Sequence, residues 1–343
     1  MAKDLVENAG QHGTLNHNST PHASPGNGEA DQAGSCFFPF KPPLSYDEQL
    51  NRLLGRGLSL GDMSRQEVCE WLGSCNYYRL RGYWMTLEDA DGCFVEGATF
   101  QDVLDIMLLD KELRGLVFAM IGPIEIKLRT QLAYHLSHAY GPDAFERPEA
   151  FANEAFHAAS LRAMDREVEL AKRGKVPCVL HNMKKYGRLP AWAAVETMSM
   201  GTASKLYGNL ASKEVAADIA ADFGVTTPYL KSWVEYLTQV RNICAHHNRF
   251  YNRLMVKRPK LHKAERRIDN AREFPVFYVL FRLYAHSWPE LGRKQLEKME
   301  GIVGSYPTVS LAPMGFPHDW QEILERVCGI AGHENLMDAW VNP

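Results

Sequence analysis

The sequence has no long apolar runs and no paired cysteines. No apolar stretch approaches the roughly 18 residues that a membrane-spanning helix needs, and residues 1–30 lack the charged-then-apolar pattern of a secretory signal. The seven cysteines are odd in number, scattered and never spaced as CxxC, which argues against a disulfide framework or a zinc ribbon. We therefore expect a soluble cytoplasmic protein with reduced thiols and no membrane contact.

A general excess of positive charge is also missing. The formal net charge is −3 over 343 residues, so no overall basic field predicts a nucleic-acid binder. Any such role must come from a local patch. The hydrophobic share of 45% is that of a globular protein with a proper core, which excludes disorder throughout the chain.

Alternating β-branched runs are absent too, whereas apolar residues recur with helical spacing along most of the chain. Helix starts are predicted by two capping boxes and one N-cap: Ser45 with Glu48, Ser64 with Glu67, and Thr99 followed by Asp102. We interpret Gly122–Pro123 as a break or kink before a second helix over 124–136. Further helices are predicted over 160–174, 190–222 (interrupted near Gly201), 228–247, 276–287, 289–302, 319–329 and 333–341. The predicted fold class is all-α.

The chain divides into three segments by composition. Residues 1–38 are nearly free of large aliphatic residues until Phe37, so we expect a disordered tail. Residues 39–98 are predicted to form a helical and aromatic segment that packs on the core. Four aromatic residues and two arginines within 76–84 favour an aromatic core pinned by cation–π contacts and hydrogen bonds. Residues 99–343 are predicted to form the main helical domain, with additional C-terminal helices.

The segment from Pro228 to Arg253 separates into two faces when it is placed on a helix at about 100° per residue. The apolar face consists of Trp233, Leu237, Val240 and Cys244. The opposite face is a narrow polar stripe of Glu235, Gln239, Asn242 and His246, which Arg249 and Arg253 would extend if the helix continued. Amide, imidazole and guanidinium groups of this kind are suited to binding and cleaving a phosphodiester.

Arg241, Asn242 and His246 are the candidate catalytic residues. Imidazole can move protons near neutral pH, and arginine is the better fixed cation for the charge of a pentacoordinate phosphate. In such a mechanism the ribose 2′-OH attacks its own phosphate and leaves a cyclic phosphate and a 5′-OH, without a metal or cofactor. DNA lacks that hydroxyl and would be spared.

The spacing of Arg241 and His246 presents a geometric difficulty, because residues five apart on an ideal helix point about 140° from each other. Three arrangements would bring them together: a helix distorted near Ala245, a long arginine that swings round, or two protomers that each supply part of a shared site. We favour the last, a homodimer.

A local basic patch follows the candidate catalytic residues. Residues 241–267 hold nine Lys or Arg against one acid, Glu265, and this excess would neutralise several phosphates. The predicted RNA-binding residues are His247, Arg249, Arg253, Lys257, Arg258, Lys260 and Lys263. Candidates for orienting the catalytic pair by a hydrogen bond are Glu125, Glu196 and Glu235, among which the sequence does not choose.

Several other interpretations compete with this one. A second Arg–His pair, Arg129 and His135, is interpreted as structural. A metal site at His246–His247 with His262 is disfavoured, because adjacent histidines on a helix point different ways and no carboxylate or thiolate lies at ligand spacing. A further interpretation is a toxin controlled by a partner protein or by nucleotide modification, with Tyr251 or a neighbouring hydroxyl as the modified group. The main rival is a catalytically silent RNA-binding or protein-interaction module of the same fold.

A set of motifs spread over the chain points to a known family. In order, they are Lys41-Pro42-Pro43-Leu44, Gln49, Leu53-Leu54, Arg56-Gly57, Asn76-Tyr77-Tyr78-Arg79-Leu80, Gly82-Tyr83, Asp110, Leu113-Arg114, Glu125, Leu128-Arg129, Leu189-Pro190, Trp192, the run from Arg241 to Arg249, and Met314-Gly315-Phe316-Pro317 with Trp320. Over residues 41–330 this pattern resembles bacterial abortive-infection proteins of the AbiD/AbiF type, which are similar to the HEPN superfamily.

The resemblance carries expectations about fold, activity and partners. It implies a multi-helix HEPN-like bundle whose RxxxxH motif, matched by Arg241, Asn242 and His246, forms a ribonuclease site at a dimer interface. It also implies an anti-phage toxin that cleaves RNA, with a small structured RNA as inhibitor. We therefore expect a metal-independent endoribonuclease of an abortive-infection system.

Overall fold

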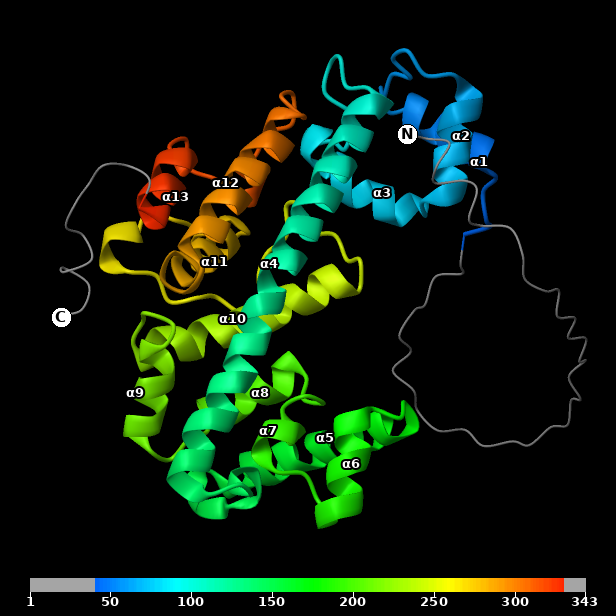
Figure 1. Ribbon diagram of the computed structural model, residues 1–343. Coiled ribbons are helices and arrows are strands. Elements are labelled where there is room, and N and C mark those ends of the chain that lie inside the picture. Colours follow the sequence, from blue (N-terminus) through cyan, green and yellow to red (C-terminus); the bar gives the residue numbers. More distant parts are fainter. Residues whose placement is uncertain (1–40, 330–343) are drawn as a thin grey trace, which may run out of the picture. The chain divides into compact units, whose positions relative to one another are not determined.

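The computed structural model describes residues 41–329 (Figure 1). Apart from isolated bridges, all the regular secondary structure in this range is helical. The α-helices are α1 (Tyr46–Leu54), α2 (Arg65–Ser74), α3 (Tyr77–Trp84), α4 (Phe100–Tyr140), α5 (Glu154–Arg173), α6 (Pro177–Tyr186), α7 (Ala191–Ala194), α8 (Met200–Gly208), α9 (Lys213–Ala221), α10 (Thr227–Ala245), α11 (Phe274–Ser287), α12 (Pro289–Gly304) and α13 (Trp320–Cys328). Only isolated bridges, and no strand, occur within this range. The all-α prediction is confirmed.

The predicted helix starts are confirmed by their capping geometry. The side chains of Ser45, Ser64 and Thr99 each accept a hydrogen bond from the backbone N–H three residues later. The acid at that position in turn accepts from the backbone N–H of the capping residue, which closes the capping box. The expected tail over 1–38 and the expected helix over 333–341 lie outside the described residues.

The expected second helix after Gly122–Pro123 is wrong, because α4 runs unbroken from Phe100 to Tyr140. Pro123 has no N–H for the carbonyl of Ala119, but Ala119 is exposed, so water can reach that oxygen. Buried residues on both sides of the proline, such as Met120 and Ile124, hold the helix in place. Helix α4 packs against α3 and against each of α7 to α12. Tertiary packing therefore outweighs a penalty of about 3 kcal/mol.

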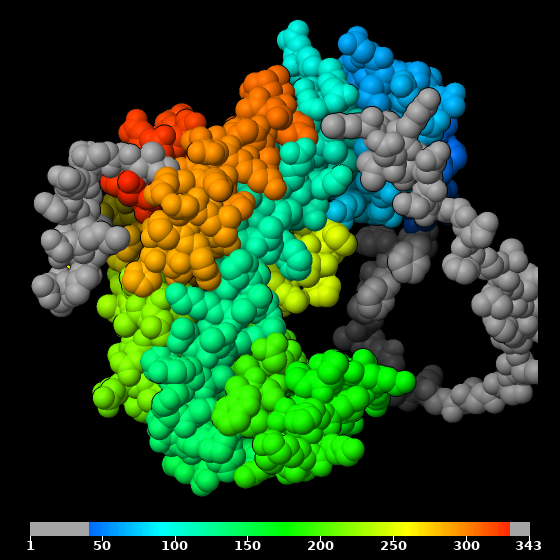
Figure 2. All heavy atoms as spheres, viewed as in Figure 1, coloured from blue at the N-terminus to red at the C-terminus, as the bar shows by residue number. Residues whose placement is uncertain are grey.

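Helix α4 is the organising element of the fold. Its 41 residues span about 60 Å at 1.5 Å per residue. In the space-filling view, its surface forms a continuous band across one face of the molecule (Figure 2). Helix α10 crosses it and packs between α4 and α8. The apolar helix α11 lies against both α4 and α10.

Two other helix predictions need correction. The region 190–222 has two breaks instead of one: the first, at 195–199, ends just before Gly201, where Ser199 caps α8 by accepting from Thr202 N–H at 3.2 Å, and the second, at 209–212, separates α8 from α9. Helix α6, which starts at Pro177, was not predicted. The aromatic segment 76–84 is itself mostly helix α3, with Tyr83 and Trp84 buried and Tyr78 77% exposed.

Candidate active site

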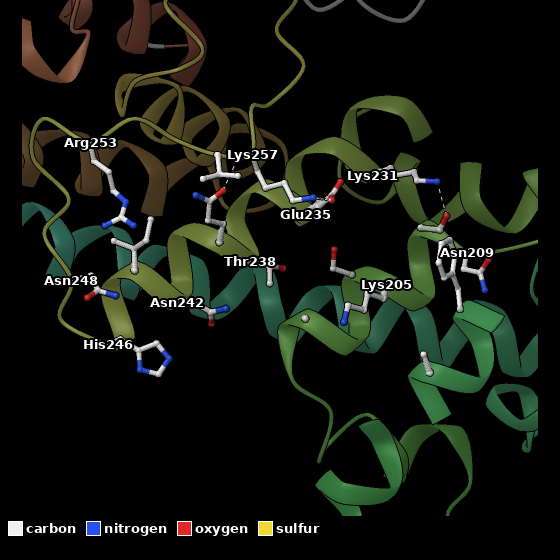
Figure 3. Close-up of a pocket in the computed structure, with 18 residues that line it drawn as sticks. Lys205, Asn209, Lys231, Glu235, Thr238, Asn242, His246, Asn248, Arg253 and Lys257 are labelled. Carbon is white, nitrogen blue, oxygen red and sulfur yellow. Dashed lines mark hydrogen bonds and ion pairs between the residues drawn. The ribbon is translucent and has the colours of Figure 1, made fainter. Parts of the chain in front are cut away.

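The polar stripe of α10 forms one wall of a groove. Trp233, Leu237, Val240 and Cys244 are buried as predicted, whereas the stripe faces an open groove of about 880 Å³ (Figure 3). The groove is lined by Phe156, Ala159, Gly201, Ser204, Lys205, Gly208, Asn209, Lys231, Glu235, Thr238, Gln239, Asn242, Ile243, His246, Asn248, Arg253, Val256 and Lys257. The two-faced pattern read from the sequence is confirmed.

Helix α10 ends at the candidate catalytic residues. Its last residue is Ala245, His246 is the C-cap, and His247 adopts a left-handed backbone with φ 53°. The chain therefore turns away from the helix axis after His246. Arg249 and Arg253 do not continue the stripe in helical register.

The turn after α10 is fixed by the buried carboxylate of Asp110 in α4. Its Oδ1 accepts hydrogen bonds from the backbone N–H groups of Phe250 and Tyr251 at 2.9 and 2.6 Å. Its Oδ2 accepts from Tyr83 Oη at 2.8 Å and from Arg114 Nε at 2.9 Å. Four donors compensate this buried charge, so the loop that follows His246 is tied to α4 and α3.

Arg249 also helps to fix the turn after α10. Its Nη1 donates to the carbonyl oxygens of Tyr251 and Asn252 at 2.5 and 2.7 Å. A Cβ at Gly82 of α3 would lie 2.6 Å from Arg249 Nε, so glycine leaves the room that the guanidinium occupies. Arg249 is thus engaged with backbone groups, which disfavours the phosphate contact that the sequence predicts for it.

Part of the polar stripe holds the loop that follows. Gln239 Oε1 accepts from the backbone N–H of Lys257 at 2.7 Å, and Glu235 forms an ion pair with Lys257. Ser232 Oγ accepts from the backbone N–H of Lys260 at 2.8 Å. These bonds secure the loop over 254–263, which carries the exposed Lys257, Arg258, Lys260 and Lys263.

The other part of the stripe is unengaged. The side chains of Asn242 and His246 are exposed and form no hydrogen bond or ion pair with any residue in 41–329. Figure 3 shows both at the edge of the groove, with His246 at one end. His247 is also exposed. The end of α10 therefore presents an amide and an imidazole to solvent beside several cations.

Arg241 faces a different neighbour, helix α4. Its Nε lies 3.7 Å from Glu125 Oε2, and its guanidinium lies 6.0 Å from the ring centre of Phe118. Glu125 is largely buried and also pairs with Arg129. Of the three candidate glutamates, Glu125 is therefore the one beside Arg241. His246 lines the groove, whereas Arg241 is not among the lining residues and lies beside Glu125 of α4.

Comparison with known proteins assigns the chain to a family. The family model described as Abi-like protein matches residues 70–252, which is more than half of the sequence. The chain belongs to the Abi-like protein family. No curated protein and no solved structure matches it significantly.

The region shared with the Abi-like family contains most of the site. It includes Asp110, Glu125, Arg241 and His246, with the helices that carry them, α4 and α10. It ends at Asn252, before the loop that bears Lys257 to Lys263. Within residues 41–329, no helix has the length and apolarity needed to cross a membrane.

The competing residues of this Abi-like protein have structural partners. Arg129 pairs with Glu125, and His135 Nε2 lies 2.8 Å from Asp222 Oδ2, which supports the structural interpretation of that pair. Tyr251 is buried and donates to the carbonyl of Ser310 at 2.9 Å, so its hydroxyl is inaccessible to a modifying enzyme.

His262 is buried as well, and its Nδ1 lies 2.7 Å from Tyr278 Oη. Burial lowers the pKa of His262 to about 4. The imidazole packs against the ring of Tyr229, at a centroid distance of 4.2 Å. Among residues 41–329 no group of three or more His, Cys, Asp or Glu side chains is placed to hold a metal ion.

Sequence reasoning missed most of the groove residues outside the polar stripe, and three of the missed residues, Lys231, Lys205 and Phe156, carry charge or an aromatic ring. Lys231 precedes Glu235 by one helical turn, so the same spacing that gave the stripe could have included it. Lys205 of α8 and Phe156 of α5 reach the groove only through the packing of α8 against both α5 and α10. Helical spacing carries no information on such contacts.

Proposed function

We propose that this Abi-like protein is a metal-independent endoribonuclease of an abortive-infection system, with Arg241, Asn242 and His246 at a composite site of a homodimer. The observation that carries the proposal is the state of the α10 stripe. Glu235 and Gln239 are bonded to the following loop, whereas Asn242 and His246 stand unengaged in a basic groove. Unpaired polar groups beside cations are suited to an anionic substrate.

The chemistry follows from these groups. The ribose 2′-oxygen forms a bond to phosphorus while the bond to the 5′-oxygen breaks, and a proton passes from the 2′-OH to a base and from an acid to the 5′-oxygen. His246 is the group that moves protons. Arg241 neutralises the charge on the phosphoryl oxygens, and Asn242 donates its amide N–H to one of them.

In the proposed dimer a second copy contributes to each site. Arg241, near the end of α10, packs against Phe118 of α4, which is 45% exposed, and Ile126 of α4 is 63% exposed. Gly115 and Gly122 share this face, with nothing within 4 Å of where a Cβ would be. Residues at these spacings lie on one side of a helix, so the uncovered strip of α4 is suited to another helix and would bring a second His246 toward Arg241.

The test is cleavage of total RNA and of 5′-labelled oligonucleotides by the purified full chain in excess EDTA. Arg241→Ala and His246→Ala are expected to lower the cleavage rate at least a hundredfold, and the wild-type fragments are expected to end in a cyclic phosphate. Arg52→Ala and His181→Ala are matched exposed controls away from the groove.

Two results would contradict the proposal. Cleavage that persists in His246→Ala would place the chemistry elsewhere. Binding of RNA without cleavage by the wild type, in the absence of any inhibitory RNA, would favour the catalytically silent binding module. A small structured RNA is the inhibitor that we propose, so the preparation must be freed of co-purifying nucleic acid.

A further inference from the structure

The groove extends well beyond the proposed catalytic end. Its lining runs along α10 from His246 back to Lys231, fifteen residues or about 22 Å at 1.5 Å per residue. Figure 3 shows His246 and Asn248 at one end and Lys231 and Asn209 at the other. A single scissile phosphate occupies only a small part of that length.

The charged side chains along the groove are mostly positive. Lys205, Lys231, Arg253 and Lys257 line it, against the single acid Glu235. Glu235 is already paired with Lys257. Lys231 Nζ donates to the carbonyl of Gly208 at 2.6 Å, which holds its ammonium group at the groove wall. The remaining positive charge is suited to a chain of phosphates.

An aromatic side chain stands at the far end. Phe156, in the first turn of α5, lines the groove and is 67% exposed. The start of α5 is fixed there because Asn153 N–H donates to Asn209 Oδ1 at 3.0 Å, and Asn209 Nδ2 donates to the Asn153 carbonyl at 2.9 Å. Ala159, three residues further along α5, also lines the groove.

We propose that the groove binds an unpaired stretch of RNA, whose backbone passes Lys205 and Lys231 and one of whose bases stacks on Phe156. An exposed aromatic ring beside cations is the arrangement that holds single strands, because every base offers a π face. In a duplex the bases are stacked on each other and cannot reach the ring. The assignment rests on the proposed ribonuclease function only in taking RNA as the ligand.

The test is binding of a fluorescein-labelled single-stranded RNA of about ten nucleotides, a length within known single-strand site sizes. Fluorescence anisotropy is measured on the full chain, with His246→Ala in every protein so that the RNA stays intact. Phe156→Ala and the double variant Lys205→Ala/Lys231→Ala are expected to weaken binding about tenfold each. Phe156→Tyr is expected to bind like the parent, because the ring is kept.

Matched controls separate the groove from general surface effects. Tyr186→Ala removes another exposed aromatic residue, and Lys213→Ala another exposed lysine, both outside the groove. Neither is expected to change binding. A fully paired duplex of the same sequence is expected to bind more weakly than the single strand and to be insensitive to Phe156→Ala.

The outcomes distinguish this proposal from the nuclease. Unchanged single-strand affinity in the groove variants, or tighter binding of the duplex, would overturn the single-strand assignment even if cleavage depends on His246. If the wild-type chain binds RNA through the groove but cleaves none, the single-strand assignment is supported and the nuclease proposal is overturned. Absence of any RNA binding would overturn the assignment and favour a protein as the ligand of the groove.

Discussion

Two buried acidic side chains fix the path of the chain after α10. Asp110 receives the backbone of Phe250 and Tyr251, and Glu273 accepts from the backbone N–H of Arg253. Neither group faces the groove, and both act on the backbone that follows His246. The backbone that follows His246 is therefore held by buried groups that do not line the groove.

Glu273 gives the protein a pH-dependent stability. Burial raises its pKa to about 8, from 4.5 in an exposed carboxyl. The unfolded chain loses this proton above pH 4.5, whereas the folded chain keeps it until about pH 8. The contribution to stability is therefore complete below pH 4.5 and is lost as the pH rises to 8.

Glu273→Gln is expected to remove this dependence. At pH 8 the variant should exceed the wild type in free energy of unfolding by roughly 2–4 kcal/mol, and near pH 5 the two should be close. Urea denaturation at pH 5, 6.5 and 8 measures the difference, with the exposed Glu196→Gln as control. Parallel pH profiles for the wild type and Glu273→Gln would refute the assignment.

Among the helices, α4 departs most from local sequence rules, because it contains Pro123 in mid-helix. Pro123→Ala supplies the missing N–H for the carbonyl of Ala119 and is expected to stabilise the fold by about 1–2 kcal/mol. The melting temperature should rise by a few degrees. Pro177→Ala, at the start of α6 where proline suits the helix, should give no such gain. A lower melting temperature for Pro123→Ala would contradict this account.

Local patterns predicted the helices that begin at a capping residue and bury one face. Ser45, Ser64 and Thr99 marked real starts, and the apolar spacing of Trp233 to Cys244 identified the buried side of α10. The pattern failed where distant contacts decide. Nothing near Arg241 indicates that its guanidinium meets Glu125, and nothing near Pro123 shows the packing that keeps α4 whole.

At the scale of the whole molecule, the proposed dimer predicts complementation. If each site takes Arg241 from one chain and His246 from the other, a heterodimer of Arg241→Ala and His246→Ala retains one intact site. After random exchange of subunits, half of the dimers are mixed, so about one quarter of wild-type cleavage should return. Each variant alone should stay inactive.

The measurement is cleavage by the 1:1 mixture after dissociation and reassembly. The matched control is the double variant Arg241→Ala/His246→Ala mixed with the wild type. Every site of its mixed dimers lacks one of the two groups, so exchange should lower cleavage from one half to about one quarter of the wild-type level, the share of wild-type homodimers. Failure of the two single variants to complement would mean that one chain supplies both groups.

The loop over 254–263 is attached to α10 through backbone N–H groups, those of Lys257 and Lys260. Most of this attachment therefore does not depend on which side chains the loop carries. The segment also lies beyond the portion shared with the family, although its residues Val256 and Lys257 line the groove. The sequence of this wall can therefore change while the helix end bearing His246 stays unchanged, so substitutions in the loop offer a way to alter what the groove binds without rebuilding the proposed catalytic end.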